Sequence, residues 1–481
     1  MRDIFREPSR EISVIARPQV LVVGGGPAGI AAAVSAARLG VDVMLVERYG
    51  FLGGMATAAL VGPLMTYHTR KRQIEKRAVA PDQAATFDTT GRRKVIRGIL
   101  DDFVGLLLQL EGTIGPRPDY GYMVPFDPEI FKRVAFWMVE DAGVTLLLHT
   151  LCVDAVVEDG VVKGAIVENK SGRGAVLADA VVDVSGDGDV AARAGAPFEI
   201  GRAEDGKTQP MTLMFHIGGV DMEAFLAYKR AHPDQFRGEA GLYDLIEKAT
   251  EAGDLDLPRE DILFFKLPRR GEIVVNTTRV INVLGTDAWD LTRAEIESRN
   301  QAVMLLKFFK GYVPGFANSY IIQTATQVGV RETRRIIGEY VISAEDIIFD
   351  RKFDDVIARA AYPIDIHNPE GKGTVMIPLE PGASYDIPYR CIVPRHIDNL
   401  LVAGKCMSGT HEAQGSFRVI PISMATGQAA GVAAALSVEK GRRPRDLLAE
   451  EVQLELLKQN AELGPNVTRK AIEKKLSGAD R

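Results

Sequence analysis

The stretch from Val20 to Glu47 constrains the fold of this chain more than any other part of its sequence. It begins with an unbroken apolar run, Val20–Val23, continues through an alanine-rich segment, Pro27–Leu39, and ends with a second apolar run, Val41–Val46, directly before the acid. Continuous apolar runs are typical of buried parallel strands, and the segment between them has the length and composition of a helix. The stretch therefore predicts a βαβ unit, with a parallel sheet covered by helices around it.

Three glycines occupy the turn between the first strand and the helix in the pattern G-x-G-x-x-G, as Gly24, Gly26 and Gly29. The first permits a tight turn, the second lets the backbone approach a pyrophosphate, and the third lets helix and strand pack closely. The helix N-terminus then presents free N–H groups to the phosphates. Glu47 follows at the spacing of a carboxylate that accepts hydrogen bonds from ribose hydroxyls. This unit predicts a bound dinucleotide.

The composition narrows the class of protein. With 481 residues, of which 46% are hydrophobic and 25% charged, the chain is globular and too long for one compact core. The net charge of −6 argues against nucleic acid as a partner. The three cysteines lack metal-ligand spacing, and the first twenty residues are charged and lack an apolar signal core, which fits a cytoplasmic protein without a metal site. The uncharged stretch Val419–Leu436 contains Pro421 and Gln428 and is interpreted as a buried helix, not as a membrane span.

Short strands and turns follow the βαβ unit and predict a β-meander. Cys152–Glu158 and Val161–Asn169 are joined by an Asp-Gly turn, and a third strand is expected over Ala175–Val184. Late in the chain, the apolar strand Leu400–Ala403 and the alanine-rich helix Ser423–Leu436 return to the pattern of the first unit. Two glycines one turn apart in that helix predict that another element packs closely against it.

From Gly201 to Ser384, between the meander and the late strand, the hydrophobic pattern is mixed. This stretch predicts a separate cap domain, with helices such as Leu291–Phe309. The tail is expected to form an amphipathic helix over Leu447–Leu463. The expected fold class is α/β, a Rossmann-like domain with a parallel sheet and a meander, plus an inserted α+β cap. The predicted parts are an N-terminal extension (1–16), the first part of the nucleotide-binding domain (17–200), the substrate or cap domain (201–384), the second part of the nucleotide-binding domain (385–440) and a helical tail (441–481).

Three segments resemble the flavin-binding motifs of the glutathione-reductase-like superfamily: "ERYGFLGGMATAAL", "VVDVSGDGD" and "NLLVAGKCMSGTHEAQGSFRVIPISMATGQAAGVAAAL". The resemblance implies that the dinucleotide is FAD and that the first segment lines the adenosine ribose and the pyrophosphate. It also implies that the last segment passes under the isoalloxazine ring to a helix that points at the flavin pyrimidine. The FAD-contacting residues that it implies are Gly24, Gly26, Pro27, Ala28, Gly29, Glu47, Arg48, Gly53, Gly54, Met55, Val153, Gly186, Asp187, Gly404, Lys405 and Met424.

Four further segments resemble the bacterial FAD-dependent oxidoreductase family, and with them the resemblance covers nearly the whole chain from about Arg17. These segments are "GKTQPMTLMFHIGGVD", "QVGVRETRRIIGEYVIS", "YDIPYRCIVP" and "THEAQGSFRV". More distantly, the last one resembles fumarate reductase flavoproteins and aspartate oxidase, in which a histidine and an arginine lie beside a substrate carboxylate. In this chain His411 and Arg418 are further apart than in that motif.

His411, Arg418 and Glu412 are the candidate catalytic residues. An imidazole in the loop before the flavin helix can take or give the proton that accompanies hydride transfer. Glu412 could orient that ring or act as the base itself, and Arg418 could stabilise the negative charge of reduced flavin or bind a carboxylate. The alternatives are structural: a histidine that only bonds the backbone, and an arginine in an ordinary ion pair.

Two further groups carry weaker signals. The arginines of Arg331–Arg335 are expected on a helix, where a solvated or ion-paired face is favoured for them. Tyr385, Tyr389 and Arg390 lie where the chain re-enters the flavin domain, and they are candidates for a substrate cleft or for packing.

The sequence is interpreted as a cytoplasmic FAD-dependent oxidoreductase that transfers a hydride between FAD and a small organic substrate in the interdomain cleft. A flavin monooxygenase fed by external NAD(P)H and oxygen, and a non-catalytic FAD-binding protein, stay open as alternatives. A second dinucleotide fingerprint is absent, because Gly186–Gly188 lacks a third glycine, which argues against a built-in NAD(P)H site. The expected partners are the substrate and an unidentified electron acceptor or donor, with neither nucleic acid nor a membrane, and a homo-oligomer stays open.

Overall fold

A parallel β-sheet of five strands forms the centre of the molecule in the computed structural model, which describes residues 4–5, 7–71 and 91–477. All its strand pairings are parallel, and four of the strands are buried along their whole length, as their continuous apolar runs predict. In spatial order the strands are β21 (Leu400–Val402), β8 (Ala180–Asp183), β2 (Val20–Val23), β3 (Val43–Val46) and β4 (Thr145–Leu147). The expected α/β fold class with a parallel sheet is confirmed.

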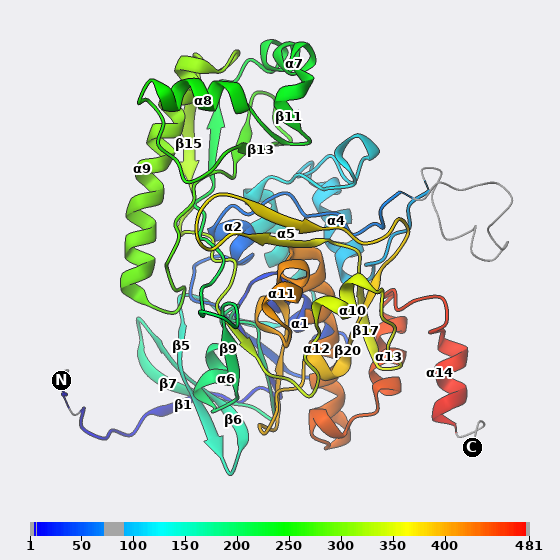
Figure 1. Ribbon diagram of the computed structural model, residues 1–481. Helices are drawn as coiled ribbons and strands as arrows, with labels where there is room; N and C mark the ends of the chain where they lie inside the picture. The colour runs from blue at the N-terminus through cyan, green and yellow to red at the C-terminus, as the bar shows by residue number, and fades with distance from the viewer. Residues whose placement is uncertain (1–3, 6, 72–90, 478–481) are drawn as a thin grey trace, which may run out of the picture.

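Helices cover one face of this sheet, with α1 (Pro27–Ala37) and α12 (Ile420–Lys440) in direct contact at the middle of the molecule (Figure 1). A Cβ atom on Gly427 would lie 2.2 Å from the carbonyl oxygen of Ala28, and one on Gly431 would lie 2.1 Å from that of Ala32. The glycines thus let two helix backbones touch, which confirms the close packing expected from their spacing. The same core includes α4 (Ile99–Gln109) and α5 (Pro128–Asp141).

The other face of the parallel sheet packs on a second sheet, in the order β1-β7-β6-β5, which contains the predicted meander. Alternate residues of β2 point to opposite faces, so that Val20 and Val22 join the helical core while Leu21 and Val23 join this one. The strands are β1 (Ser13–Ala16), β5 (Leu151–Glu158), β6 (Val161–Asn169) and β7 (Gly172–Leu177). The third predicted strand is two strands, because the backbone of Ala178 and Asp179 turns between β7 and β8 to bond Lys163 and Gln19.

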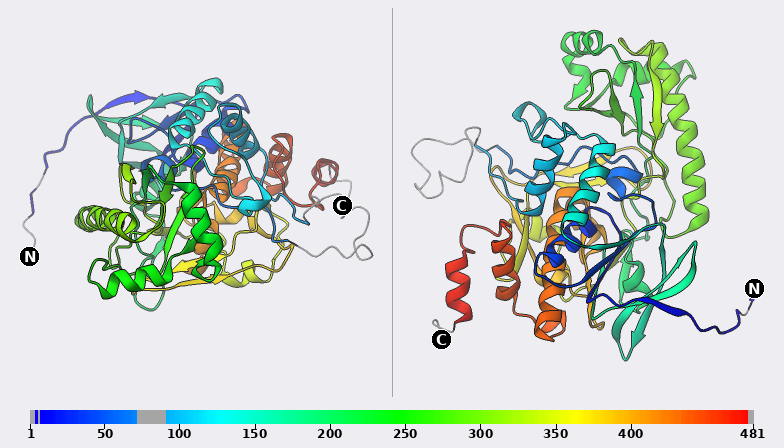
Figure 2. Two further views of the ribbon diagram at one scale, coloured as in Figure 1. Left: turned by 90° about the horizontal axis from the view of Figure 1, so that it is seen from above. Right: turned by 180° about the vertical axis from the view of Figure 1, so that it is seen from behind.

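A six-stranded sheet with three helices forms a second body at one end of the molecule, and the chain termini lie on opposite sides (Figures 1 and 2). Its apolar side chains, from Phe215 to Phe316, form a core of their own. The strands in spatial order are β11 (Phe236–Arg237), β12 (Ala240–Gly241), β13 (Ile262–Lys266), β14 (Ile273–Val275), β10 (Phe215–Gly218) and β15 (Tyr320–Thr324), and the helices are α7 (Met222–Ala231), α8 (Tyr243–Glu251) and α9 (Ala288–Tyr312).

The chain then returns to the first body before residue 384, the end predicted for the cap. Side chains from Ile342 to Leu379 pack in the core that also holds α1 and α12. Their elements are α10 (Ala344–Ile348), β17 (Val356–Ala360) and β18 (Ile364–His367), and β17 pairs with β20 (Tyr385–Pro388). The strand β19 (Thr374–Ile377) pairs with β18 but is exposed. The part of the predicted cap with its own core is therefore narrower than 201–384, while the division into domains stays a prediction.

Three local predictions differ from the structure. The expected helix at Arg331–Arg335 is wrong, because Arg334–Ile336 forms a strand, β16, that pairs with β9 (Phe198–Ile200). The predicted tail helix is the shorter α13 (Ala449–Lys458), and a further helix, α14 (Arg469–Leu476), follows it. The loop expected around His411 contains a short helix, α11 (His411–Phe417).

Within the described ranges, no single helix combines the length and the apolar composition needed to cross a membrane. The pair α11 and α12 meets both criteria only when joined, and the two helices are bent by 94° relative to each other.

Candidate functional site

The glycine-rich turn lies between β2 and the start of α1, and its shape depends on glycine. Gly24 has φ +108°, and a Cβ there would lie 2.5 Å from the carbonyl oxygen of Val184. A Cβ on Gly29 would lie 1.8 Å from the carbonyl oxygen of Gly24, so the helix can start this close to the strand only with glycine. A Cβ on Gly26 would meet only the Cα of Gly54, in ordinary van der Waals contact at 3.8 Å. Gly26 is also the N-cap of α1 and gives it no side-chain cap, so the first N–H groups of the helix can bind a phosphate.

Glu47 lies at the end of β3 with its carboxylate against this turn. Its Oε2 accepts from the backbone N–H of Gly25 at 2.6 Å, and its Oε1 accepts from that of Tyr49 at 2.9 Å. Burial raises the pKa of this carboxyl, and the two backbone hydrogen bonds act in the opposite direction. Each oxygen keeps a further lone pair, which is what a ribose hydroxyl requires.

Segments far apart in the sequence meet at the turn. A Cβ on Gly54 would lie 2.8 Å from the Cα of Gly26, and a Cβ on Gly404 would lie 3.1 Å from the Cβ of Ala28. Lys405 follows Gly404, and its Nζ donates to the Oδ1 of Asp187 at 2.8 Å. The structure thus brings the predicted residues of all three flavin-like segments around the start of α1. The open backbone at Gly26, the uncapped helix and the buried carboxylate together fit a dinucleotide with a pyrophosphate.

Asp187 is the half-buried acid of this group. Burial works to raise the pKa of its carboxyl, but the ammonium of Lys405 and the hydroxyl of Thr333 outweigh it, so that the pKa is lowered. Thr333 donates to the same oxygen at 2.7 Å, which ties the segment before β16 to the flavin-like segment. Asp187 is thus held as an anion beside a lysine.

Four of the predicted FAD-contacting residues lie at the margin of this group. Arg48 is exposed, and its Nη2 donates to the side chain of Gln327 at 2.7 Å. Met55 begins a short helix, α2 (Met55–Ala58), Val153 lies in β5, and the side chain of Met424 is fully buried in the core.

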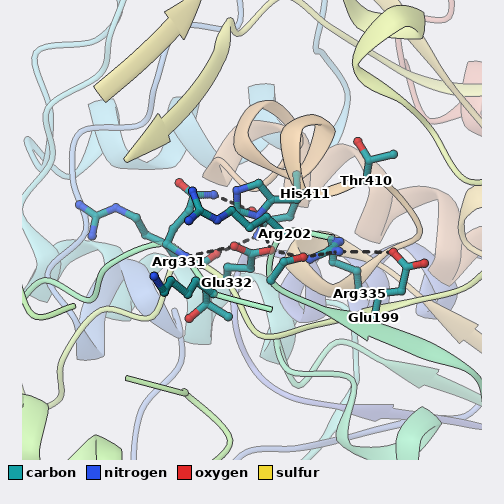
Figure 3. Close-up of polar contacts among 12 residues, drawn as sticks. Glu199, Arg202, Arg331, Glu332, Arg335, Thr410 and His411 are labelled. Atoms are coloured by element: carbon teal, nitrogen blue, oxygen red, sulfur yellow. Dashed lines mark hydrogen bonds and ion pairs between the residues drawn. The ribbon is translucent and has the colours of Figure 1, made fainter. Parts of the chain in front are cut away.

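His411 is the first residue of α11, and its side chain is only 5% exposed. The hydroxyl of Thr410 caps this helix by accepting from the N–H of Ala413 at 3.3 Å, which explains why a helix begins here. The Nδ1 atom of His411 lies 2.9 Å from the Oε1 atom of Glu332 (Figure 3). The imidazole is therefore fixed by a buried carboxylate from another segment of the chain.

Glu332 is a residue of this site that the sequence did not reveal. Its side chain is fully buried, its Oε1 also accepts from Arg335, and its Oε2 accepts from the N–H of Gln209 at 3.1 Å. Arg335 is buried as well and donates to the carbonyl oxygen of Gly409, two residues before His411. The arginines expected on a solvated face are thus partly internal, and Figure 3 shows Arg335 and Arg331 on opposite sides of Glu332.

The carboxylate beside His411 belongs to Glu332 and not to Glu412, whose side chain is exposed on α11. Arg418 follows the last residue of α11, and its Nη2 lies 3.1 Å from the carbonyl oxygen and 3.4 Å from the Oδ2 of Asp365. His411 and Arg418 thus lie at the two ends of one short helix, directly before α12 begins at Ile420.

Tyr385, Tyr389 and Arg390 have structural partners. The hydroxyl of Tyr385 lies 2.7 Å from the hydroxyl oxygen of Ser416, and that of Tyr389 donates to the carbonyl oxygen of Pro444 at 2.8 Å. Arg390 pairs with Asp355 at 2.9 Å. The two tyrosines are buried in the first core. Their observed contacts are those of packing residues, one of the two roles expected for them.

The arrangement around His411 suits proton transfer. Glu332 already accepts from Arg335 and from a backbone N–H, so it acts as an acceptor and the Nδ1 of His411 is its donor. With the proton on Nδ1, Nε2 is the ring nitrogen that can accept a proton, and the carboxylate stabilises the imidazolium that results. No hydrogen bond to Nε2 is made within the part of the chain that the structure describes.

Known proteins share parts of this sequence. Two curated relatives are digeranylgeranylglycerophospholipid reductases, from Methanoculleus marisnigri (28% identical over 35% of this chain and 38% of the relative) and from Methanospirillum hungatei (31% identical over 31% and 33%). The chain therefore matches only about a third of the length of these relatives.

Solved structures resemble the fold only loosely. One is a geranylgeranyl bacteriochlorophyll reductase-like protein of Thermoplasma acidophilum, with 15% identity and a TM-score of 0.45 over 95% of this chain and 87% of that one. Another is the p-nitrophenol 4-monooxygenase of Pseudomonas putida, with 12% identity and a TM-score of 0.45 over 96% and 89%.

A family model described as FAD dependent oxidoreductase matches residues 19–456, a range that begins directly before β2 and ends within α13. The matched range contains the glycine-rich turn, Glu47, the Asp187–Lys405 pair and the His411–Glu332 pair. The chain is therefore a member of the FAD-dependent oxidoreductase family, and FAD is its cofactor.

Proposed function

We propose that the protein transfers a hydride between bound FAD and a small organic substrate, with His411 taking up or returning the accompanying proton. FAD, when bound, supplies the redox chemistry, because it accepts or donates two electrons as a hydride. The observation that carries the proposal is the buried His411–Glu332 pair at the start of α11, between the Gly404 turn and α12.

The residues that would hold the cofactor follow from the geometry of the turn. Gly24, Gly26 and the first N–H groups of α1 would bind the pyrophosphate, and Glu47 would accept from the ribose. The Gly404–Lys405 turn and the start of α12 would face the isoalloxazine ring, in the manner of the glutathione-reductase-like superfamily that the three sequence segments resemble. The positive end of α12 would favour negative charge there.

The protein supplies proton handling and orientation. Glu332 keeps the proton on the Nδ1 of His411, so that Nε2 receives the proton when the substrate is oxidised and returns it when the substrate is reduced. Arg335 and the backbone N–H of Gln209 keep the Glu332 carboxylate in place. His411 is buried, so bulk water has little access to the proton that it carries.

The test uses purified full-length protein under anaerobic conditions. The protein should be yellow and release FAD on denaturation, and a panel of metabolites should contain one that bleaches the flavin. His411→Gln should then bind FAD as tightly as the wild type but reduce roughly 10²-fold more slowly with that metabolite. Tightly bound NAD in place of a flavin, or an unchanged reduction rate in His411→Gln, would contradict the proposal. Oxygen uptake with substrate hydroxylation would assign the flavin monooxygenase alternative instead.

A further inference from the structure

Four arginines from separate parts of the chain gather around His367, and one of them, Arg331, belongs to the segment that holds Glu332. Arg331 directly precedes Glu332, and its carbonyl oxygen accepts from the side chain of Gln414 on α11 at 2.8 Å. Gln414 also accepts from Gln209 at 3.1 Å, and Gln209 in turn accepts from the backbone N–H of His367 at 3.3 Å. The other arginines act on one another and on His367 electrostatically: they are Arg259, Arg279 and Arg418.

The guanidinium groups of Arg331 and Arg279 have no carboxylate in contact among the described residues. Arg331 donates to the carbonyl oxygen of Pro210 and to the hydroxyl of Thr212, both at 2.7 Å. Arg279 donates to the carbonyl oxygen of Gly373 at 3.3 Å and lies 3.1 Å from the Nδ1 of His367. Both are therefore held in place by neutral partners, and the acids that act on them, such as Asp365, do so without direct contact.

The remaining two arginines have one carboxylate each. Arg259 pairs with Asp261 at 2.8 Å, and Arg418 with Asp365 at 3.4 Å. The Nε atom of Arg418 is buried and has no hydrogen-bond partner within the described chain. A buried guanidinium N–H without an acceptor is unfavourable, so this atom needs an acceptor that the protein does not provide.

The excess of positive charge affects the pKa values of the residues in this arginine group. Burial and the surrounding guanidiniums of Arg418, Arg259 and Arg279 lower the pKa of Arg331 well below its ordinary value. Burial, followed by the charge of Arg259, lowers the pKa of Arg279 to about 10. The pKa of His367 is also lowered, first by burial and then by the arginines, so its ring is neutral and its Nδ1 can accept from Arg279. The charge that remains belongs to the guanidiniums.

We propose that Arg279, Arg331 and Arg418 bind an oxyanion of the substrate, a carboxylate or a phosphate, beside His411. Guanidinium groups match both oxyanions in geometry, and a bound anion would supply the missing charge and an acceptor for Arg418. This inference rests on the proposed function, since it names the substrate class of the same site. Arg331 and Glu332 are adjacent in the chain and face the arginine group and His411 respectively, so an anchored substrate would lie next to the proton-accepting nitrogen.

The first test measures anion binding without turnover. Succinate, inorganic phosphate and the neutral analogue succinamide are titrated into FAD-loaded full-length protein at low ionic strength, with calorimetry and the flavin absorption spectrum as readouts. Succinate or phosphate should bind at a single saturable site, and succinamide should not bind. Stronger binding of succinate assigns a carboxylate substrate, and stronger binding of phosphate assigns a phosphorylated one. If neither anion binds, the proposal is wrong.

The second test places the anion on the arginines. Arg331→Gln and Arg418→Gln should each raise the Kd of the bound anion at least about tenfold, since a charged hydrogen-bonding partner is lost. The matched control is Arg133→Gln, an arginine of α5 that is 60% exposed, and it should bind the anion as the wild type does. Unchanged affinity in both buried-site variants would overturn the proposal.

The fold of each variant is monitored by its FAD content and melting temperature, and Arg279→Gln replaces Arg331→Gln if the latter does not fold. Removing one of several mutually repelling cations should leave the anion-free melting temperature of the variant no lower than that of the wild type, whereas the rise of melting temperature with succinate should be lost. A protein that binds anions but whose flavin no metabolite reduces would disprove the proposed function alone. A flavin that is reduced only by neutral substrates would disprove the anion site alone.

Discussion

A single carboxylate decides which nitrogen of His411 can accept a proton, and it does not come from the segment that carries the histidine. Glu332 contacts His411, while Glu412, its neighbour in sequence, is exposed. We expect Glu332→Gln to slow flavin reduction roughly 10²-fold with the substrate found by the anaerobic screen, because the imidazolium loses its counter-charge. Stopped-flow absorbance measures this rate, and FAD content reports on the fold.

The matched control for that prediction is Glu412→Gln, which removes an equivalent charge from the adjacent position. It should reduce at the wild-type rate, since no contact between its carboxylate and His411 is seen. A larger loss in Glu412→Gln than in Glu332→Gln would reverse the assignment of the two acids. A change in KM alone for Glu332→Gln would make the residue a substrate-binding group and not a positioning one.

Asp183, at the end of β8, makes stability depend on pH. Burial raises its pKa from an ordinary 3.8 to about 6, although the N–H of Ala191 and the side chain of Ser185 donate to it. The folded protein therefore binds this proton more tightly than the unfolded chain does. The stability that Asp183 contributes is fully present below pH 3.8 and is lost as the pH rises to about 6.

The dependence of stability on pH is large enough to measure. The free energy of unfolding that Asp183 contributes at low pH, and loses as the pH rises, is about 3 kcal/mol, since each tenfold change in proton affinity is worth about 1.4 kcal/mol. In urea unfolding, the free energy of unfolding of the wild type should fall relative to that of Asp183→Asn between pH 4 and pH 7, because the amide does not titrate. Parallel pH profiles for the two proteins would show that Asp183 is not the group responsible.

The residues of the site differ in how visible they are in the sequence. Gly24, Gly29 and Glu47 could be identified because their roles are local: a turn, a close approach and a strand end at a fixed spacing. Glu332 could not, because its role arises only when the segment before β16 packs beside α11, and nothing in "RETRR" distinguishes an internal acid from a surface one. The charged residues there were instead expected on a solvated helix.

At the scale of elements, the packing of α1 against α12 holds the nucleotide turn in place. Gly431 of α12 touches the backbone of Ala32, whereas Gly105 of α4 has open space around the position of a Cβ. Gly431→Ala should lower the free energy of unfolding by about 1–3 kcal/mol, because the added methyl group forces the helices apart. Gly105→Ala should be neutral or raise it by up to about 1 kcal/mol, because alanine favours a helix.

Urea unfolding followed by far-UV circular dichroism compares these two alanine variants. FAD affinity should fall only in Gly431→Ala, since the same helix contact positions the start of α1. Equal stability of the two variants would mean that the helices separate with little loss of free energy. The contact is also the clearest success of sequence reasoning among the elements, because two glycines one turn apart on an alanine-rich helix indicate a close neighbour without naming it.

The strand β16 shows why other elements were missed. Arg334–Ile336 is a strand because it pairs with β9, more than a hundred residues earlier in the chain. Such long-range pairing produces no periodic pattern in the local sequence from which the strand could be predicted. The chain returns to the first core before residue 384, and the local sequence did not predict this return for the same reason. The elements from Ile342 to Leu379 are short and mixed, and only their tertiary contacts assign them to the body that holds α1 and α12.

At the scale of the whole molecule, the second body has an apolar core separate from the one beneath the FAD site. Phe316 lies fully buried in it, with its ring 5.3 Å from that of Phe225 and 5.2 Å from that of Phe309. The nucleotide turn, by contrast, is built on the first core. We therefore predict that this body, which holds Arg279 near one end of its sheet, can be loosened without loss of FAD.

Phe316→Ala is the change that tests this independence, because it should destabilise the second body by about 3–5 kcal/mol. Hydrogen exchange followed by mass spectrometry should show faster exchange in β10, β13, β14 and β15, with no change in β2, β3 and β8, and FAD affinity should stay at the wild-type value. Anion affinity should fall, because Arg279 follows β14 and its position depends on that sheet. Uniformly faster exchange throughout the protein, together with loss of FAD, would instead mean that the two cores unfold as one cooperative unit, and the arginine group would then lie within a single domain.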